Sequence, residues 1–244
     1  MTSSSIRDDY DAVLERIQAA CQRVGRDPAG VQVVAVTKTV AAERIRAAVD
    51  AGLDTFGENR VQEAIAKRGA LADLDIEWHL VGPLQSNKAR KAVETFDVIE
   101  SVDSVELAHR LDRIAGELRP RRPLPVLLQV NIDRDPAKGG FDPADLDAAL
   151  ADIEGCRSLA IDGLMTVGRQ VATAEQARPT FEALRNVSSS LRTRHERLGP
   201  GLSMGMTDDF EVAIEVGATI VRIGRALFGE RPHSHGDSDA EHTH

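Results

Sequence analysis

A lysine stands where a strongly apolar run ends. Residues 33–38 read VVAVTK, so Lys38 follows a segment whose composition predicts a buried β-strand. Such a lysine can simply extend its ammonium group to solvent at the end of the strand. Alternatively, the amine is removed from water, which lowers its pKa and frees its lone pair to condense with an aldehyde. The second interpretation predicts a Schiff base site at Lys38.

Two glycine-containing segments near the end of the sequence could bind an anion. They read GLSMGMTDDFEVAIE (201–215) and VRIGRALFG (221–229). Such turns usually serve chain reversal, but at Gly224 bare backbone N–H groups could also approach an anion. Either segment alone is a weak signal. Together with a lysine at the end of a strand they indicate a phosphorylated aldehyde, and pyridoxal 5′-phosphate (PLP) is the common cofactor of this kind.

Four other polar residues each have two interpretations. Arg222 lies in an apolar run, where it either pairs with an acid on a neighbouring strand or faces the ring nitrogen of a bound pyridoxal. In the second position it would discourage protonation of the ring and weaken its capacity to store carbanion electrons. Asn59 either hydrogen-bonds a ring hydroxyl or a loop, or caps the helix expected from Arg60. His79 is either a hydrogen-bonded core residue or a functional one. Lys138 is expected to be solvated in a polar loop, with a second anion contact as the alternative.

The elements that position these residues alternate between apolar runs and helical patterns. Near-continuous apolar runs are typical of parallel strands covered on both faces. About eight βα units, after one helix around 8–24, predict a closed (β/α)8 TIM barrel, with an open doubly wound sheet as the alternative. In such a barrel the strand ends meet at one mouth, which brings Lys38 and the glycine segments together. The expected strands are 31–37, 54–58, 76–82, 97–103, 125–132, 159–167, 201–205 and 219–228, and the expected helices include 41–51, 142–154, 179–192 and one that Ser104 begins.

The composition limits the classes of function. The chain has 244 residues, 42% of them apolar, and a formal net charge of −9, which disfavours nucleic acids and anionic membranes as partners. Cys21 and Cys156 stand in no metal-ligand spacing and are expected to be reduced thiols. With no signal region and no membrane-spanning run, a cytoplasmic location is expected. We expect one domain over 1–230 and a disordered His-rich tail over 231–244, without a dedicated metal site.

Several segments, taken together, resemble one protein family. They read VAVTK, FGENRVQE, WHLVGPLQSNK, VNIDRDPAKGG, GLMT, LSMGMTDDFEVAIEVGAT and VRIGRALFG. On these motifs, the sequence is identified as a member of the YggS/PROSC family of pyridoxal phosphate homeostasis proteins. The match extends from the first expected helix to ALFG, which is essentially the whole chain. The resemblance implies a single barrel similar to the N-terminal domain of bacterial alanine racemases (PLP fold type III), without their second β-domain.

The resemblance also implies roles for particular residues. It implies that Lys38 holds PLP as an internal aldimine and that Arg222 lies near the ring nitrogen. The positions matched to the phosphate site are Ser203, Gly205 and Gly224. Family members often carry Ser or Thr after RIG, whereas this chain has Arg225. Its guanidinium could supply charge at the phosphate in place of a hydroxyl.

Three functions fit a lysine that reacts with an aldehyde. The chain could carry PLP as a Schiff base for intracellular vitamin B6 homeostasis, be a PLP-dependent amino-acid racemase, or be a class I aldolase-like lyase in which Lys38 attacks the substrate directly. Related racemases use the lysine and a tyrosine as opposing bases. The one tyrosine of this chain, Tyr10, belongs to the expected N-terminal helix, although His79 could in principle replace it. We therefore expect a carrier without substantial catalysis, monomeric, with PLP-dependent apoenzymes as candidate recipients.

Overall fold

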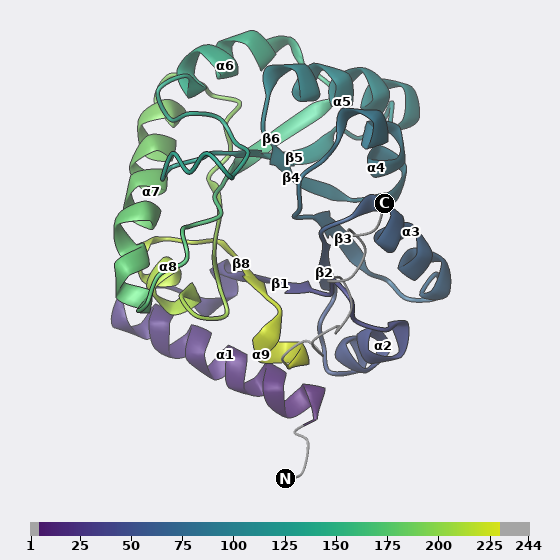
Figure 1. Cartoon of the computed structure of the whole chain (residues 1–244), viewed down its shortest axis with the longest axis vertical. Coiled ribbons are helices and arrows are strands. Elements are labelled where there is room, and N and C mark those ends of the chain that lie inside the picture. The colour runs from purple at the N-terminus through teal and green to yellow at the C-terminus, as the bar shows by residue number, and fades with distance from the viewer. Residues whose placement is uncertain (1–4, 230–244) are drawn as a thin grey trace, which may run out of the picture.

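The apolar runs form the strands of a closed parallel barrel. The computed structural model describes residues 5–229, and in it the strands pair in chain order from β1 to β8. The ring closes where Val34 and Ala35 of β1 lie opposite Arg222 and Ile223 of β8. Figure 1 shows the helices arranged around the strands. The expected (β/α)8 barrel is thus confirmed, and the open doubly wound sheet is excluded.

The strand bounds agree with the expected runs to within a few residues, apart from the last. The strands are β1 (Gln32–Val36), β2 (Thr55–Glu58), β3 (Glu77–Leu80), β4 (Val98–Val102), β5 (Leu124–Gln129), β6 (Leu159–Met165), β7 (Gly201–Met206) and β8 (Ile220–Ile223). The α-helices are α1 (Ile6–Arg23), α2 (Ala42–Asp50), α3 (Val61–Ala70), α4 (Ala89–Thr95), α5 (Val105–Leu118), α6 (Leu146–Asp152), α7 (Arg178–Arg192), α8 (Phe210–Val216) and α9 (Arg225–Phe228). Short 3₁₀ turns lie at Pro28–Gly30, Ser86–Lys88, Ile153–Gly155 and Ala174–Ala177.

The starts of two helices follow from local side-chain caps. The Ser5 side chain accepts a hydrogen bond from the Asp8 N–H, and the Asp8 carboxylate accepts one from the Ser5 N–H, so a capping box begins α1. Ser104 caps α5 by accepting from the Leu107 N–H at 3.3 Å, as expected. Leu107 and Ile114 of α5 are then buried on one face of the helix. Caps and an apolar face together place the helix against the barrel.

Helix α1 lies beside the place where the barrel closes. Figure 1 shows it running along α8 and α9, with which it is in contact. Arg16 pairs with Glu211 at 2.7 Å, and Arg23 pairs with Glu215 at 2.6 Å, so two ion pairs join α1 to α8. The apolar face of α1 is buried. The first and last elements of the described chain therefore support each other.

The last strand is shorter than expected. The strand expected over 219–228 ends at Ile223, and helix α9 follows directly after Gly224. The adjacent residues Leu227 and Phe228 are both buried. They lie in a helical turn that packs against α1, and two adjacent apolar residues are compatible with burial in such a turn as well as in a strand covered on both faces. The apolar run was thus correct as a buried segment but wrong as a continuous strand.

One helix begins later than expected. The helix expected over 142–154 starts at Leu146, although Asp142 does act locally as a capping residue. Its carboxylate accepts a hydrogen bond from the Ala144 N–H at 2.8 Å, which forms a turn before the helix instead of its first turn. Leu146 at the start of the helix and Ile153 just after its end are both buried.

Two expectations from the sequence concern the C-terminal tail and membrane-spanning segments. The tail expected to be disordered, residues 231–244, lies outside the described residues, and so do its histidines. Within the described range, no helix combines the length and apolar character that crossing a membrane requires. No group of metal-ligating side chains occurs in that range either.

The close approach of β6 and β7 generates a stability prediction. Gly163 has φ +156°, and a Cβ atom there would lie 2.0 Å from the Gly201 carbonyl oxygen. Gly163→Ala should therefore lower the free energy of unfolding by about 1–3 kcal/mol, because backbone would have to move. Gly69→Ala is the control, since no atom lies within 4 Å of that position in α3, and it should stabilise by about 0.5–1 kcal/mol. Chemical denaturation of both variants measures this, and equal stabilities would contradict it.

Candidate functional site

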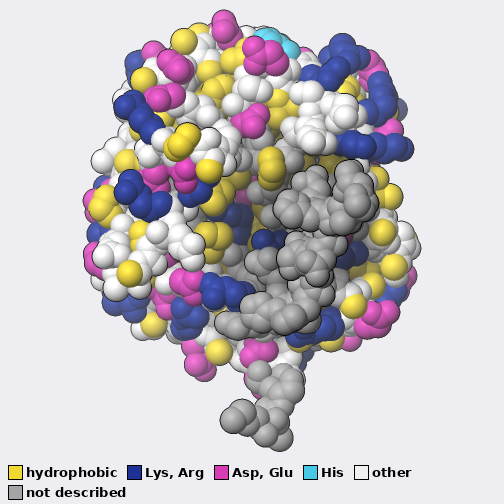
Figure 2. All heavy atoms as spheres, in the orientation of Figure 1, with side chains coloured by type: hydrophobic (Ala, Val, Ile, Leu, Met, Phe, Trp, Pro, Cys, Tyr) yellow, Lys and Arg dark blue, Asp and Glu magenta, His cyan; other side chains and the backbone are white. Residues whose placement is uncertain are grey.

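A cavity of about 510 Å³ opens at one end of the barrel. Its wall consists largely of residues that follow the carboxyl ends of β1, β2, β3, β6, β7 and β8. This is the end at which (β/α)8 barrels place their sites, and the volume is in the range of small-molecule sites. Figure 2 shows this face hollowed near its centre, with Lys and Arg side chains in and around the hollow. The cavity therefore favours an anionic ligand.

The predicted site residues divide into two groups. Those that line the cavity are Lys38, Asn59, Arg222, Gly224 and Arg225. His79, Ser203 and Gly205 do not contribute to its wall. The first group comes from the ends of the first, second and eighth strands, of which β1 is paired with both β2 and β8. The barrel thus brings together residues that are far apart in the sequence.

Lys38 and Gly224 belong to adjacent strand ends. Lys38 is half-buried in the turn that follows β1, two positions after Val36. Gly224 follows β8, and a Cβ atom placed on it would lie 3.5 Å from the Val36 carbonyl oxygen. Asn59 lines the cavity from the end of β2 instead of capping α3, whose N-cap is Arg60 without a side-chain hydrogen bond.

A chain of buried polar side chains crosses the interior of the barrel below the cavity. Glu100 of β4 accepts a hydrogen bond from Ser203 of β7 at 2.5 Å, and these strands are not neighbours, so the two side chains meet inside the barrel. Arg222 donates to the Ser203 hydroxyl at 2.5 Å and to the Thr166 carbonyl oxygen at 2.7 Å. His79 Nδ1 lies 2.6 Å from Glu100 on the other side. Ser203 and His79 are thus placed below the cavity wall.

The buried charges of His79, Glu100 and Arg222 compensate one another. Burial alone would raise the pKa of Glu100, but His79 and Arg222 hold that pKa below its ordinary value. Burial alone would lower the pKa of His79, but the hydrogen bond to Glu100 and the nearby Glu77 raise it to about 9. Burial lowers the pKa of Arg222, which Glu100 and Asp209 partly offset. A carboxylate therefore lies between an imidazolium and a guanidinium.

Gly205 serves the backbone between β7 and α8. Its φ is +92°, a conformation that side chains disfavour, and a Cβ atom there would lie 2.6 Å from the Ala213 Cβ. The Phe210 Cα would be only 2.9 Å away. The glycine lets the chain turn closely over α8, so that the neighbouring Met206 and Thr207 line the cavity.

Two further arginines stand at the cavity. Arg225, after β8, forms an ion pair with Asp208, after β7, and both side chains are largely exposed. Arg44 of α2 donates to the Phe228 carbonyl oxygen at 2.9 Å and also lines the cavity. Arg44 was not singled out from the sequence, because an arginine on a helix is usually only a surface residue. Glu100 was also missed, although an acid inside the apolar run DVIESVD was a usable signal.

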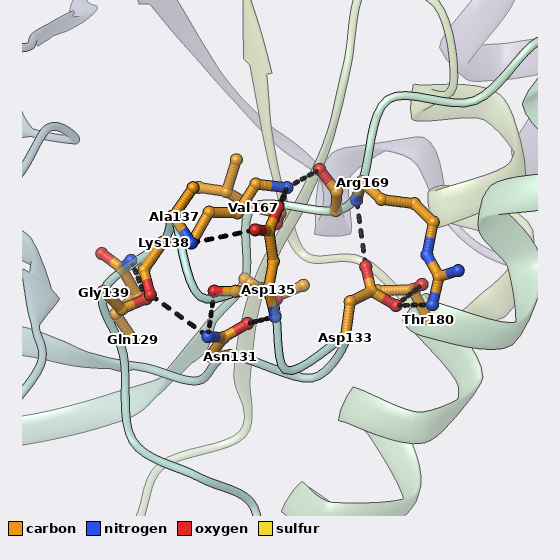
Figure 3. Close-up of polar contacts among 12 residues, drawn as sticks. Gln129, Asn131, Asp133, Asp135, Ala137, Lys138, Gly139, Val167, Arg169 and Thr180 are labelled. Carbon is orange, nitrogen blue, oxygen red and sulfur yellow. Dashed lines mark hydrogen bonds and ion pairs between the residues drawn. The ribbon is translucent and has the colours of Figure 1, made fainter.

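Lys138 is held by the protein and is not simply solvated. Figure 3 shows its ammonium directed at the segment after β6, where it donates to the Gly168 carbonyl oxygen at 2.9 Å. In the same loop Asp133 accepts hydrogen bonds from Thr180 at 2.7 Å and from the Arg169 side chain at 2.9 Å. The loops after β5 and β6 are therefore tied to each other, next to the cavity residue Val167. The expectation that Lys138 is simply solvated is therefore wrong, because its ammonium is hydrogen-bonded to the protein.

Known proteins that are similar to this chain establish its family. A family model described as alanine racemase, N-terminal domain, matches residues 9–232. The chain belongs to this family. Its relatives include the pyridoxal phosphate homeostasis protein of Pseudomonas aeruginosa, 43% identical over 230 residues, which are 93% of this chain and 96% of that protein. The protein of the same name from Escherichia coli K12 is 41% identical over 238 residues, 95% and 99% of the two chains.

Solved structures of alanine racemase N-terminal domain relatives agree with the barrel. PipY of Synechococcus elongatus PCC7942, solved with PLP bound, superposes with a TM-score of 0.79 at 46% identity, covering 89% of this chain and 100% of that chain. Alanine racemase of Clostridium difficile 630 superposes with a TM-score of 0.66 at 15% identity, covering 91% of this chain and 56% of that one. The second likeness is one of fold alone. The family resemblance inferred from the motifs is confirmed.

The raised pKa of His79 generates a pH prediction. Since folding raises this pKa from 6.5 to about 9, the resulting stabilisation is complete below about pH 6.5 and is lost as the pH rises through about 9. Relative to His79→Gln, the wild-type protein should lose roughly 3 kcal/mol of unfolding free energy over this range. Urea denaturation of both proteins at a series of pH values measures the difference. Parallel curves would show that the imidazole does not titrate in this way.

Proposed function

We propose that this protein binds PLP at the mouth of the barrel and serves the intracellular balance of that cofactor, without substantial catalysis. The observation that carries the proposal is that Lys38, Arg222 and Gly224 line one cavity. Relatives at 41–43% identity that match nearly the whole chain are named pyridoxal phosphate homeostasis proteins. PipY, at 46% identity, has been solved with PLP bound. Recipient apoenzymes and a monomeric state remain predictions.

The residues present fit the cofactor. PLP has an aldehyde, a pyridine nitrogen and a phosphate dianion, and it supplies an electrophilic carbonyl with an electron-withdrawing ring. The cavity offers an amine from Lys38, a buried guanidinium from Arg222, and polar loop residues after β7 and β8 with the added charge of Arg225. Its 510 Å³ accommodates a ligand of that size.

Each side chain has a defined task in this proposal. Lys38 would hold the aldehyde end of the cofactor, because its amine is the cavity group that can condense with a carbonyl. Arg222 keeps its proton, because guanidinium is not deprotonated at neutral pH and Glu100 lies 3.9 Å from it, so it presents only hydrogen-bond donors to the ring nitrogen. Gly224, Thr207 and Arg225 receive the phosphate. Ser203 acts from below by orienting Arg222 instead of touching the phosphate.

The part of the chain that the structure describes does not give the cavity the pair of bases that racemisation needs. Among the described residues that line it, the ionisable ones are Lys38, Arg44, Asp208, Arg222 and Arg225. Of these, arginines do not exchange protons near neutral pH, and Asp208 is 73% exposed and paired with Arg225. Tyr10 lies on α1 and His79 lies below the cavity, in contact with Glu100. Among residues 5–229, therefore, no second base lines the cavity opposite Lys38, which favours the carrier over the racemase.

The Schiff base assignment predicts the site of covalent labelling. The sequence has lysines at 38, 67, 88, 91 and 138, of which Lys38 is the one that lines the cavity. Incubation with PLP should turn the protein yellow, and reduction with borohydride followed by peptide mapping should place the adduct on Lys38. Lys38→Ala should abolish the adduct, whereas Lys91→Ala, on the exposed face of α4, should keep it. An adduct mainly on Lys138 or Lys67 would refute the assignment.

The absence of an opposing base among the described cavity residues predicts negligible racemisation. With PLP bound, incubation with L-alanine or D-alanine should leave the enantiomer unchanged over hours, as chiral chromatography would show. An ordinary enzyme would turn over on the order of once per second or faster. Turnover at that rate would establish the racemase alternative. A colourless protein that traps a small carbonyl compound on reduction would instead support the aldolase.

A further inference from the structure

A second lysine lies buried behind the Lys38 turn. The Lys67 side chain of α3 is 10% exposed, and its ammonium donates three hydrogen bonds. The acceptors are the Thr37 carbonyl oxygen at 2.6 Å, Glu58 Oε1 at 2.6 Å and Glu63 Oε1 at 2.8 Å. Three donors are all that an ammonium group has. All three N–H donors of Lys67 are thus hydrogen-bonded within the protein, and Lys67 does not line the cavity.

This cluster holds the backbone on both sides of Lys38. On the preceding side, Lys67 binds the Thr37 carbonyl oxygen, and the Thr37 hydroxyl donates to Glu58 Oε1 at 2.6 Å. On the following side, the Thr39 N–H donates to Glu63 Oε1 at 2.6 Å. Thr39 has φ +64°, a left-handed conformation that a β-branched residue rarely adopts without support. Lys38 is therefore carried on a short turn fixed at each end by a charged group.

Stability alone does not account for the cluster. Glu58 is fully buried and its Oε2 has no hydrogen-bond partner. Burial raises the pKa of Glu58 even though Lys67 and Thr37 oppose the shift. Buried ion pairs can often be replaced by apolar residues of similar volume without loss of stability. An apolar residue in place of Lys67 could not donate a hydrogen bond to the Thr37 carbonyl oxygen. The turn that carries Lys38 would then lose this support.

We propose that Glu58, Glu63 and Lys67 are positioning residues that set how fast Lys38 condenses with an aldehyde. This inference rests on the proposed function. In the reaction the uncharged Lys38 amine adds to the carbonyl carbon, and its two N–H protons leave with the carbonyl oxygen as water. A C=N bond replaces C=O, with no oxidant or reductant. The cluster takes no part in these bonds; it fixes where the amine stands when they form.

Two measurements, the rate of imine formation and the affinity for PLP without the covalent bond, test the proposal. Lys67→Met in the wild-type background should slow the growth of the yellow imine absorbance about tenfold or more, because small displacements of a reacting group have effects of this size. In the Lys38→Ala background, where PLP binds without the covalent bond, Lys67→Met should change the dissociation constant by less than about twofold. The effect of Lys67 would then depend on the presence of Lys38.

Two further variants keep the test decisive. Lys91→Met is the matched control, because it makes the same change on a lysine paired with Glu94 at the surface of α4, and it should alter neither quantity. Glu63→Ala removes the acceptor of the Thr39 N–H from a partly exposed position, so it should slow imine formation even where Lys67→Met does not fold. Glu63→Gln keeps an acceptor oxygen and should restore most of the rate.

The outcomes separate the two proposals. A change of about tenfold or more in the PLP dissociation constant on Lys67→Met in the Lys38→Ala background would overturn the positioning role. The cluster would then shape the whole cavity. Unchanged imine formation in folded Lys67→Met and Glu63→Ala would overturn it as well. If the wild-type protein itself gives no adduct at Lys38, the proposed function fails, and the inference fails with it.

Discussion

A single buried carboxylate, Glu100, fixes the arrangement inside the barrel. Its two oxygens contact His79 on the neighbouring strand β3 and Ser203 on the distant strand β7. Arg222, bound to the same serine, stands 3.9 Å from Glu100. A guanidinium buried to this degree is tolerated only beside an anion, and the carboxylate in turn needs its cations. The orientation of Arg222 in the cavity follows from this balance.

The cavity is therefore shaped by charges that do not line it. Glu100 lies beneath Arg222, and Glu58 with Lys67 lies behind the turn of Lys38. One cluster holds the guanidinium of Arg222 through Ser203, and the other holds the backbone on both sides of Lys38. Residues packed behind the wall in this way are expected to matter for binding as much as those on it, because a group that has to react or pair must be held in place beforehand.

Sequence patterns predicted the barrel well because they report local rules. Apolar runs, helical periodicity and caps such as Ser104 follow from spacing within one segment, and Lys38 could be placed at a strand end from the same patterns. Gly224 fell inside the run that was expected as the last strand. Ser203 was harder, because the weak run GLSMG does not say which face of the strand it presents, and the residue points into the barrel. The end of β8 was misjudged because Leu227 and Phe228 read equally well as strand or helix.

The ionic clusters could not be predicted from the sequence, for a different reason. Glu63 and Lys67 stand four residues apart, which is a recognisable helix pair, but nothing in that spacing shows that both touch the turn at Lys38. Glu100 and Arg222 are separated by about half the length of the chain. Contacts of this kind depend on the closed barrel and not on any local signal.

The closure of the ring between β1 and β8 also sets an order of events. Lys38 follows the first strand, whereas Gly224 and Arg225 follow the eighth, so Lys38 is made before them in translation. A nascent chain that has emerged only as far as β7 would carry the reactive amine but not the loop that completes the pocket around it. The most distant contacts in the chain must form before any ligand can be retained. The complete cavity wall is consequently a property of a chain folded through α9 and not of shorter growing intermediates.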